Sequence, residues 1–521
     1  MVYYKLFNMS YKSNMEKIKK ECNELLDFIK VHKTSFILTI FFTFIIYGIK
    51  LFNYSISIDT EVIISNYTAL VNSWYGIGRF SLGFLKFILG LNPFNYYLSN
   101  VLMILFFAIS SFGLYYCFNL VNPTKNSSKL EEIKIFLFTA LIISSPIFAE
   151  QFNFTLQCAE VAISLFILDI GVYFFIKSIQ SKNIFLLVIP IICFTENFGC
   201  YQAFVPVIIA ILVEILILLN KNYNYSVKEN IIFILKAFFV GVISLIGYFV
   251  IGKLVLHFFN IPGGSYLKDQ ILWLSEPIKN VILNILNYVK AIVKGDSIFY
   301  NHLYLVAIIL TFINIIKDYK KVFCNLLSIV LLLTPFMFSV LMGNSLVART
   351  QLVLPIILSI ILIYNTKFKN NYLNYILYII IFAFVFSQSK TTLNLFESDY
   401  ARYTQDKAFA ENILSKVDSL IDDENTTKIV FVGQRQQSGP SVHTTGETFG
   451  GSFFFWDYVS VCGMNNRAIG FINTLGHNFH GISPDEFEMA KKVAKEKNLQ
   501  SFPKSNSFCK YNNYIIIKLS D

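Results

Sequence analysis

The residues best suited to chemistry come directly after the first long apolar run of the chain. There Ser57-Ile58-Asp59-Thr60-Glu61 places two carboxylates two positions apart, next to a hydrophobic surface. In an extended segment both carboxylates would point to the same side, whereas in a helix they would diverge. An apolar environment raises the pKa of a carboxylate, so either acid could act as a general base. An ordinary solvated acidic loop is the alternative interpretation.

Two arginines could bind an anion near these acids. Arg79 lies in the same loop, directly after Gly76-Ile77-Gly78, whose glycines let the backbone approach a ligand, and Arg349 begins a late apolar run after Gly343. The planar guanidinium group matches the geometry of a phosphate. An arginine that reaches out to lipid headgroups is the alternative for each.

Further polar side chains occur in loops that we expect on the same membrane face. They are Glu150, Gln151, Asn153, Gln157, Glu160, Glu196, Asn197, Tyr201 and Gln202. Together they suit a cavity open to that face, although each one alone is also explained as a helix-end residue. Asp169 and Glu214 lie deeper in their runs, where pairing with lysines is simpler than a charge relay. Walker A, GxSxG and HExxH patterns are absent from the sequence, which disfavours ATP-driven transport and metalloprotease chemistry.

The composition identifies the elements that must position these residues. Of 521 residues, 55% are hydrophobic and only 15% are charged. That is too apolar for a cytosolic enzyme and indicates an α-helical polytopic membrane protein. The net charge of +10 comes from the first 400 residues, because the remainder holds 13 basic and 13 acidic residues. We expect contact with the lipid bilayer rather than with nucleic acid, since basic residues do not cluster among exposed aromatics.

Apolar runs predict eleven transmembrane helices. Their expected ranges are 34–52, 97–118, 133–149, 159–176, 183–197, 200–219, 237–256, 301–316, 322–341, 346–364 and 371–389. The lysine distribution predicts that the N-terminus is inside and that the C-terminal part is outside. Loops 53–96 and 257–300 are then the long outside loops, and an apolar stripe within 267–294 predicts a helix lying in the outer interface.

Three domains are expected. The sequence predicts that residues 1–33 form a cytoplasmic amphipathic segment and that residues 34–390 form the transmembrane domain. It predicts a small extracytoplasmic α/β domain at residues 391–521. In the last we expect helices at 400–422 and 485–498, the latter opened by Ser483 and Pro484, and strands at 428–433, 452–462 and 514–519. Cys462 and Cys509 could form a disulfide if this part is outside.

Six short motifs in order carry a resemblance to a known family. They are SIDTE (57–61), WYGIGRF (74–80), LNPFNYY (91–97), SPIFAEQFNF (145–154), ENFGCYQAF (196–204) and GNSLVARTQ (343–351). Over roughly residues 30–420 the chain resembles bacterial membrane glucosyltransferases similar to the phage-encoded O-antigen glucosyltransferase of type II. Each motif is weak alone, and their order and shared outside placement carry the resemblance.

The resemblance implies a C-class glycosyltransferase of the bacterial cytoplasmic membrane. Such enzymes take a sugar, here expected to be glucose, from a polyprenyl-phosphate donor and transfer it to a cell-surface glycan acceptor such as O-antigen at the outer face. It implies an acid of the first outside loop as base, with Asp59 preferred over Glu61, in an inverting displacement. Arg79 and Arg349 would bind the donor phosphate. Sugar hydroxyls would be held by Glu150, Asn153, Glu196, Tyr201 and Gln202.

The acidic motif departs from the adjacent acids expected in many relatives, so the choice between Asp59 and Glu61 stays open. No cofactor and no metal site is predicted, although a divalent cation is compatible with the class. A transporter or flippase of lipid-linked saccharides and a polysaccharide polymerase are the alternative functions. Eleven spans are excessive for a mere anchor of a recognition domain.

Overall fold

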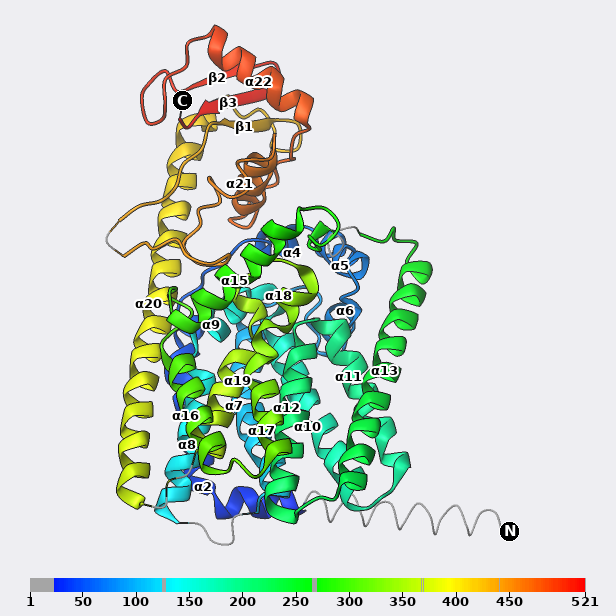
Figure 1. The fold of residues 1–521 in the computed structure, drawn as a ribbon. Coiled ribbons are helices and arrows are strands. Elements are labelled where there is room, and N and C mark those ends of the chain that lie inside the picture. Colours follow the sequence, from blue (N-terminus) through cyan, green and yellow to red (C-terminus); the bar gives the residue numbers. More distant parts are fainter. Residues whose placement is uncertain are drawn as a thin grey trace.

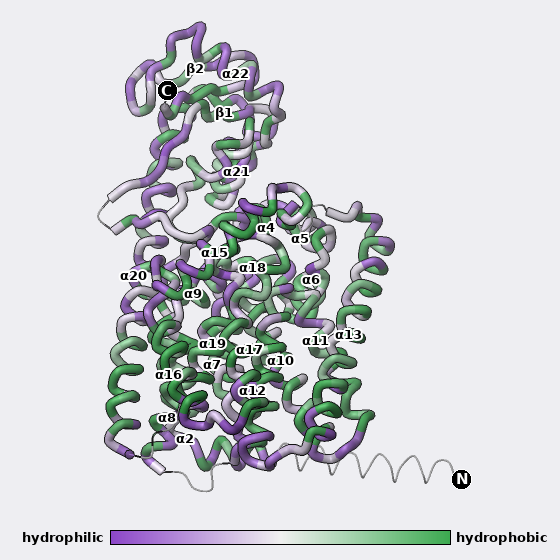
Figure 2. The backbone as a smooth tube through the Cα atoms, viewed as in Figure 1, coloured by the Kyte–Doolittle hydropathy of each residue, from purple (hydrophilic) through white to green (hydrophobic). Residues whose placement is uncertain are grey.

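The protein is an elongated helical bundle with its C-terminal part at one end. The computed structural model describes residues 23–123, 128–264, 269–366, 368, 370–439 and 441–520. We call residues 421–520 the tail, and the end of the bundle that carries it the tail-side end (Figure 1). Figure 2 shows mostly hydrophobic residues along the bundle and a mixed, more hydrophilic tail.

Helices make up almost all of the bundle. In its first half they are Asn23–Val31, α2 (Lys33–Tyr47), α3 (Ile49–Phe52), α4 (Thr60–Ser65), α5 (Tyr67–Gly76), α6 (Phe80–Ile88), α7 (Tyr96–Val121), α8 (Lys129–Ile143), α9 (Pro146–Asn153), η1 (Thr155–Gln157), α10 (Cys158–Gln180), η2 (Ile184–Leu187), α11 (Val188–Cys200) and α12 (Phe204–Tyr223). In its second half they are α13 (Val227–Phe258), α15 (Ile278–Lys294), α16 (Leu303–Lys317), α17 (Val322–Leu333), η3 (Thr334–Phe336), α18 (Met337–Met342), η4 (Ala348–Thr350), α19 (Val353–Ser359), η5 (Ile360–Asn365), α20 (Asn371–Val417) and η6 (Asp418–Leu420).

The apolar helices support a polytopic membrane protein. Among the described residues, six helices are long and apolar enough to cross a membrane, and two bent pairs raise this number to eight. Three shorter apolar helices, Ile184–Cys200, Leu303–Lys317 and Val353–Asn365, fall where further spans were expected. The count of eleven therefore stays a prediction. Outward-facing side chains are largely apolar, as Phe238 (69% exposed) and Phe249 (61% exposed) on α13 illustrate, which suits contact with lipid rather than water.

Two local expectations change in the structure. The range 371–389 and most of the range 400–422 belong to one continuous helix, α20, because no glycine or proline interrupts residues 371–417. Loop 53–96 folds into three short helices, α4 to α6. The amphipathic N-terminal segment lies outside the described residues up to residue 22, and the helix Asn23–Val31 meets α2 at an angle of 84°.

The tail contains a small sheet and two helices. The strands β1 (Lys428–Val432), β2 (Phe508–Tyr511) and β3 (Tyr514–Lys518) pair in the order β1-β3-β2, with β1 parallel and β2 antiparallel to β3. The remaining elements are α21 (Gly463–Asn473) and α22 (Pro484–Glu496). Ser483 caps α22 as predicted, in a reciprocal capping box with Glu486.

Two features of the tail differ from the sequence prediction. The strand expected at 452–462 is wrong: this segment is a series of turns that leads into α21. Its run of aromatic side chains packs against α20 and α21, as Phe454 does on Phe409 and Phe453 on Phe471, and forms no pleated strand. Cys462 and Cys509 are both free thiols in the structure.

Candidate functional site at the tail-side end

The two acids of the first loop meet a guanidinium from the tail. Arg467, on α21, places Nη2 2.8 Å from Asp59 Oδ1 and Nη1 2.6 Å from Glu61 Oε1. Its Nε donates to Asp457. Asp59 precedes α4 with a left-handed backbone (φ 67°), and Glu61 lies in the first helical turn. The expected extended segment is therefore a helix start, and both carboxylates converge because they share one cation.

The two acids differ sharply in their access to solvent. The side chain of Asp59 is 34% exposed, whereas that of Glu61 is 1% exposed. Burial raises the pKa of Glu61 to about 7 and outweighs the attraction of Arg467, which lowers it, while the nearby Asp59 raises it further. Burial lowers the pKa of Arg467, but its carboxylate partners outweigh this and raise it above its usual value. Asp59 is thus the accessible acid and Glu61 the shielded one.

Close packing holds α21 against α4. Gly470 lies one helical turn from Arg467, and a Cβ there would lie 3.1 Å from Glu61 Cγ. A glycine at this position lets the two helices approach closely enough for Arg467 to reach both acids.

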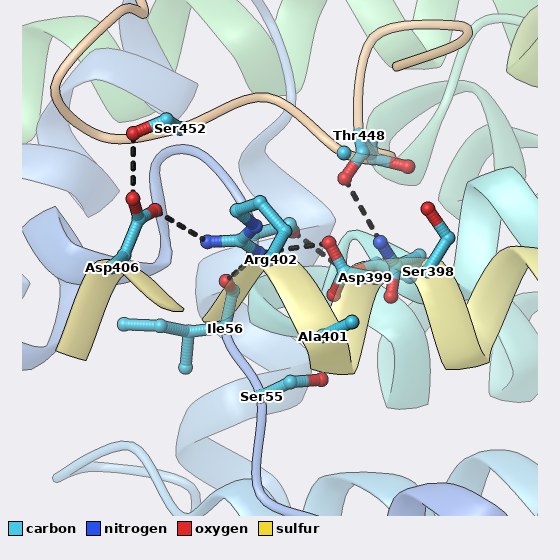
Figure 3. A network of polar contacts seen from close by, with 12 residues as sticks. Ser55, Ile56, Ser398, Asp399, Ala401, Arg402, Asp406, Thr448 and Ser452 are labelled. Atoms are coloured by element: carbon cyan, nitrogen blue, oxygen red, sulfur yellow. Dashed lines mark hydrogen bonds and ion pairs between the residues drawn. The ribbon is translucent and has the colours of Figure 1, made fainter. Parts of the chain in front are cut away.

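A buried network anchors the segment that leads to Asp59 (Figure 3). Arg402 of α20 donates to the carbonyl oxygen of Ile56 (2.6 Å) and pairs with Asp399 (2.8 Å) and Asp406 (3.4 Å). Asp406 also accepts bonds from Ser452 Oγ (2.6 Å) and from the backbone N–H of Phe453 (3.1 Å). One arginine therefore ties the first loop, α20 and the tail together.

A second polar cluster involves Glu150 and Arg349. A loop of the tail reaches into the bundle, where the backbone N–H of Glu447 donates to Glu150 Oε1 (2.5 Å). The Glu447 carboxylate accepts a bond from Arg349 Nε (2.5 Å). The Arg349 guanidinium also lies 4.7 Å from the centre of the Phe154 ring. The predicted anion-binding and sugar-binding residues are thus neighbours, joined by a tail residue.

Tyr201 packs against one of the two predicted phosphate-binding arginines. The guanidinium of Arg79 lies over the Tyr201 ring at 4.9 Å. Tyr201 also contributes to the electrostatic environment of Arg349. Arg79 and Arg349, which are 270 positions apart in the sequence, therefore lie in the same part of the bundle.

Three predicted sugar-binding residues bond to the protein itself. Asn153 Oδ1 accepts from Lys50 (2.7 Å) and Asn153 Nδ2 donates to the carbonyl oxygen of Thr448 (2.9 Å). The other two residues form bonds inside the bundle: Glu196 accepts from Ser164 Oγ (2.7 Å) and Asn197 Nδ2 (3.1 Å), and Gln202 Nε2 donates to Ile77 O (3.3 Å) and Tyr248 Oη (3.1 Å).

Buried polar groups near Glu150 have capacity for a ligand. Within the part of the chain that the structure describes, neither side-chain polar atom of Gln151 or Gln157 makes a hydrogen bond, and the same is true of Glu150 Oε2 and Arg349 Nη1. Buried polar groups are ordinarily satisfied, so such a concentration indicates a position for a polar molecule. Lys86 and Glu160 form a fully buried ion pair (2.8 Å) in the same region.

Sequence reasoning missed the tail residues of this site. Arg467, Glu447 and Asp457 were not among the candidates, although arginine content offered a signal. The chain has only five arginines, Arg79, Arg349, Arg402, Arg435 and Arg467, among 43 basic residues. Four of the five contact carboxylates or aromatic rings in the clusters described above.

Comparison with known proteins identifies the family. A model of the family described as glucosyl transferase GtrII matches residues 48–366, more than half of the chain. The chain belongs to this family. It is therefore a glucosyltransferase that acts on cell-surface glycans, as the resemblance implied. The matched region contains both acids, Arg79, Glu150 and Arg349, whereas Glu447 and Arg467 lie beyond it. No curated protein sequence matches the chain.

Proposed function

We propose that this glucosyltransferase transfers glucose from a polyprenyl-phosphate donor to a surface glycan at the outer face of the bacterial cytoplasmic membrane. The observation that carries the proposal is the accessible carboxylate of Asp59 at the same end of the bundle as Arg79, which lies over Tyr201, and Arg349, which pairs with Glu447 of the tail. A lipid-linked donor keeps its tail in the bilayer, so its phosphate and sugar must react at such an end.

Asp59 is the proposed general base. Its carboxylate accepts the proton of the acceptor hydroxyl, and the hydroxyl oxygen forms a bond to the anomeric carbon. The bond from that carbon to the phosphate oxygen breaks, and polyprenyl phosphate leaves with the electron pair. Attack opposite to the leaving group inverts the anomeric centre. Glu61, which is buried, would position Arg467 and Asp59 and not contact the acceptor.

Arg79 and Arg349 are the proposed ligands of the leaving phosphate. Fixed guanidinium groups stabilise the negative charge that develops on it without reorganisation. Glu447 links Glu150 to Arg349, and Tyr201 lies under Arg79. We propose that Glu150 and Tyr201 hold hydroxyls of the transferred sugar, together with the amides of Gln151 and Gln157. The internal bonds of Asn153, Glu196 and Gln202 favour a positioning role for these three residues.

The proposed orientation places the tail outside. Lys177, Lys221 and Lys317 end their helices at the opposite end, which agrees with the rule that cytoplasmic ends are rich in lysine. A metal ion is not required by this proposal, because Arg467 already supplies a positive charge to the two acids.

The test is transfer of labelled glucose from synthetic polyprenyl-phosphate glucose by the purified full chain in lipid. Membranes from a host that lacks the gene serve as the acceptor. We expect Asp59→Asn to lower the rate by a factor of about 10² or more and Glu61→Gln to lower it less. Asp457→Asn is the matched control, because Asp457 also pairs with Arg467 but is not assigned to chemistry.

Two outcomes would contradict the proposal. If wild type moves no sugar from this donor, the donor assignment is wrong and transport in proteoliposomes should be measured. If Asp59→Asn is as active as Asp457→Asn, then Asp59 is not the base.

A further inference from the structure

A large polar cavity lies at the end of the bundle opposite the tail. Its volume is about 680 Å³, and its walls come from the ends of α7, α12, α16 and η5 and from the starts of α8, α17 and α20. These segments lie at the end of the bundle away from the tail and from α4, which follows Asp59 (Figure 1). No role in sugar transfer has been assigned to it.

The lining of this cavity carries a net positive charge. Four lysines, Lys134, Lys221, Lys317 and Lys321, line it, against the two acids Glu131 and Asp318. Glu131 is partly neutralised, because it accepts a bond from the Tyr115 hydroxyl and lies 3.8 Å from Lys134. The excess of lysines over acids in the cavity lining favours an anionic ligand.

Asn365 holds one of the lysines in place. Lys221 Nζ donates to Asn365 Oδ1 (2.9 Å), and Asn365 Nδ2 donates to Glu214 Oε2 (2.7 Å). Asn314 Nδ2 donates to the Asn365 carbonyl oxygen (3.1 Å). Glu214 is fully buried, so this chain of bonds is anchored in the bundle and the cavity wall is preorganised.

A second lysine lines the same cavity as Lys221. Lys221 lies on α12, whereas Lys321 directly precedes α17, three positions before Cys324, which also lines the cavity. Two lysines from separate segments of the chain therefore line one cavity. Amide side chains, among them Asn222 and Asn325, surround them and offer both donors and acceptors.

The surface beside the cavity is apolar. Ile316 at the end of α16 is 73% exposed, and Val322 and Leu326 at the start of α17 are 62% and 56% exposed. A soluble anion would need only the charged cavity. A cationic, amide-lined cavity next to exposed aliphatic side chains suits a molecule with a phosphate at one end and hydrocarbon at the other.

We propose that this cavity binds the phosphate-bearing headgroup of a membrane lipid. The phosphate pairs with Lys221 and Lys321, the amides bond to polar groups of the headgroup, and the acyl chains lie along α16 and α17. Basic pockets between transmembrane helices are known to take anionic headgroups in this way. The lipid site is separate from the proposed donor site, so the two proposals can be tested independently.

The test is titration of the purified full chain in detergent with phosphatidylglycerol, followed by native mass spectrometry. We expect Lys221→Gln/Lys321→Gln to weaken binding by about tenfold or more, since each lysine near an anionic headgroup contributes to affinity. Lys228→Gln/Lys320→Gln is the matched control: it removes two exposed lysines near the same end that do not line the cavity. Binding by this control should change by less than about twofold.

Additional measurements identify the part of the lipid that is bound and test whether the variants are folded. Lys221→Arg/Lys321→Arg should retain binding, because it keeps both charges. Diacylglycerol, which lacks the phosphate, should not bind. Equal weakening in the control variant, or equal binding of diacylglycerol, would overturn the proposal. Competition by inorganic phosphate at the lipid's own concentration would assign the site to a soluble anion and overturn the lipid assignment.

Discussion

At the scale of single residues, Glu61 is the most strongly perturbed acid of the first loop. Its carboxylate is shielded from solvent, and one oxygen, Oε2, makes no hydrogen bond within the described part of the chain. Burial places its pKa at about 7, above the ordinary value of 4.5. Charging Glu61 therefore opposes folding.

The pH dependence of stability should show this. Between about pH 4.5 and 7 the folded chain holds a proton on Glu61 that the unfolded chain releases. The contribution of Glu61 to the free energy of unfolding is fully present below pH 4.5. It decreases by about 3 kcal/mol in total as the pH rises to 7. Thermal unfolding in detergent at pH 5 and pH 7 should show a smaller decrease for Glu61→Gln than for wild type. The control Glu488→Gln, at an exposed position of α22, should behave like wild type. The same pH dependence of thermal unfolding in wild type and both variants would show that the pKa of Glu61 is not raised.

Arg467 offers a second test at this scale. Arg467→Gln leaves Glu61 buried without its counter-charge and removes the link between α21 and α4, so we expect a loss of about 3 kcal/mol. Arg467→Lys should be intermediate, because an ammonium group keeps the charge but cannot span three carboxylates as the guanidinium does. Thermal unfolding and sugar transfer measure the effect, with Arg435→Gln as control. Wild-type stability and transfer in Arg467→Gln would show that the ion pairs do not hold the site.

At the scale of elements, α20 connects the bundle to the tail. Its 47 residues span about 70 Å at 1.5 Å per residue, more than twice the hydrocarbon core of a bilayer, about 30 Å. Its first part packs in the bundle, and its second part carries Arg402, Asp406 and the buried face against the tail. The helix therefore transmits a fixed spacing and orientation from the membrane part to the tail.

Breaking α20 between these parts should separate tail and bundle. Glu397 is exposed and lies just before the Arg402 network. Glu397→Pro removes a helix hydrogen bond and should cost about 3 kcal/mol, loosening the tail. We expect faster release of the tail by limited proteolysis and a loss of sugar transfer. Glu397→Ala should leave both unchanged. A tail that resists protease equally in both variants would show that contacts other than α20 hold it.

At the scale of the whole molecule, the two ends of the bundle differ in their chemistry. The tail-side end contains the acids, Arg79, Arg349 and the tail contacts, whereas the opposite end contains lysines and the lipid-site cavity. This asymmetry fits a protein that reacts at one membrane face and is oriented by positive charge at the other.

Native cysteines can measure the orientation. Cys462 and Cys509 are the half-exposed cysteines of the tail, whereas Cys117, Cys158, Cys193, Cys200 and Cys324 are buried. We expect a membrane-impermeant maleimide to label wild type in spheroplasts. Cys462→Ser/Cys509→Ser should lose this labelling, because the five other cysteines that the structure describes are buried. Labelling of wild type only after permeabilisation would indicate the reverse orientation.

Sequence patterns predicted the local features well. Hydrophobic runs marked α7, α10, α12 and α13, because a helix long enough to cross a bilayer is apolar whether it lies inside the bundle, as α7, α10 and α12 do, or faces outward, as α13 does. The cap at Ser483 and the strand at 514–519 also followed from local rules. The expected strand at 452–462 was wrong, because its consecutive aromatic residues, such as Phe453 and Phe454, pack into the tail core from turns rather than from a pleated strand.

By itself, the sequence determined the membrane class, the family, and the individual acids and arginines that could do chemistry. Only the tertiary structure decided which of them meet. Arg467 reaches Asp59 and Glu61 across some 400 residues, and Arg349 pairs with Glu447 of the tail. Hydropathy and helix-capping signals depend on residues that are close together in the sequence, so the sequence alone reveals them. The ion pairs depend on how α20 and the tail dock onto the first loop, and no short stretch of sequence records that docking.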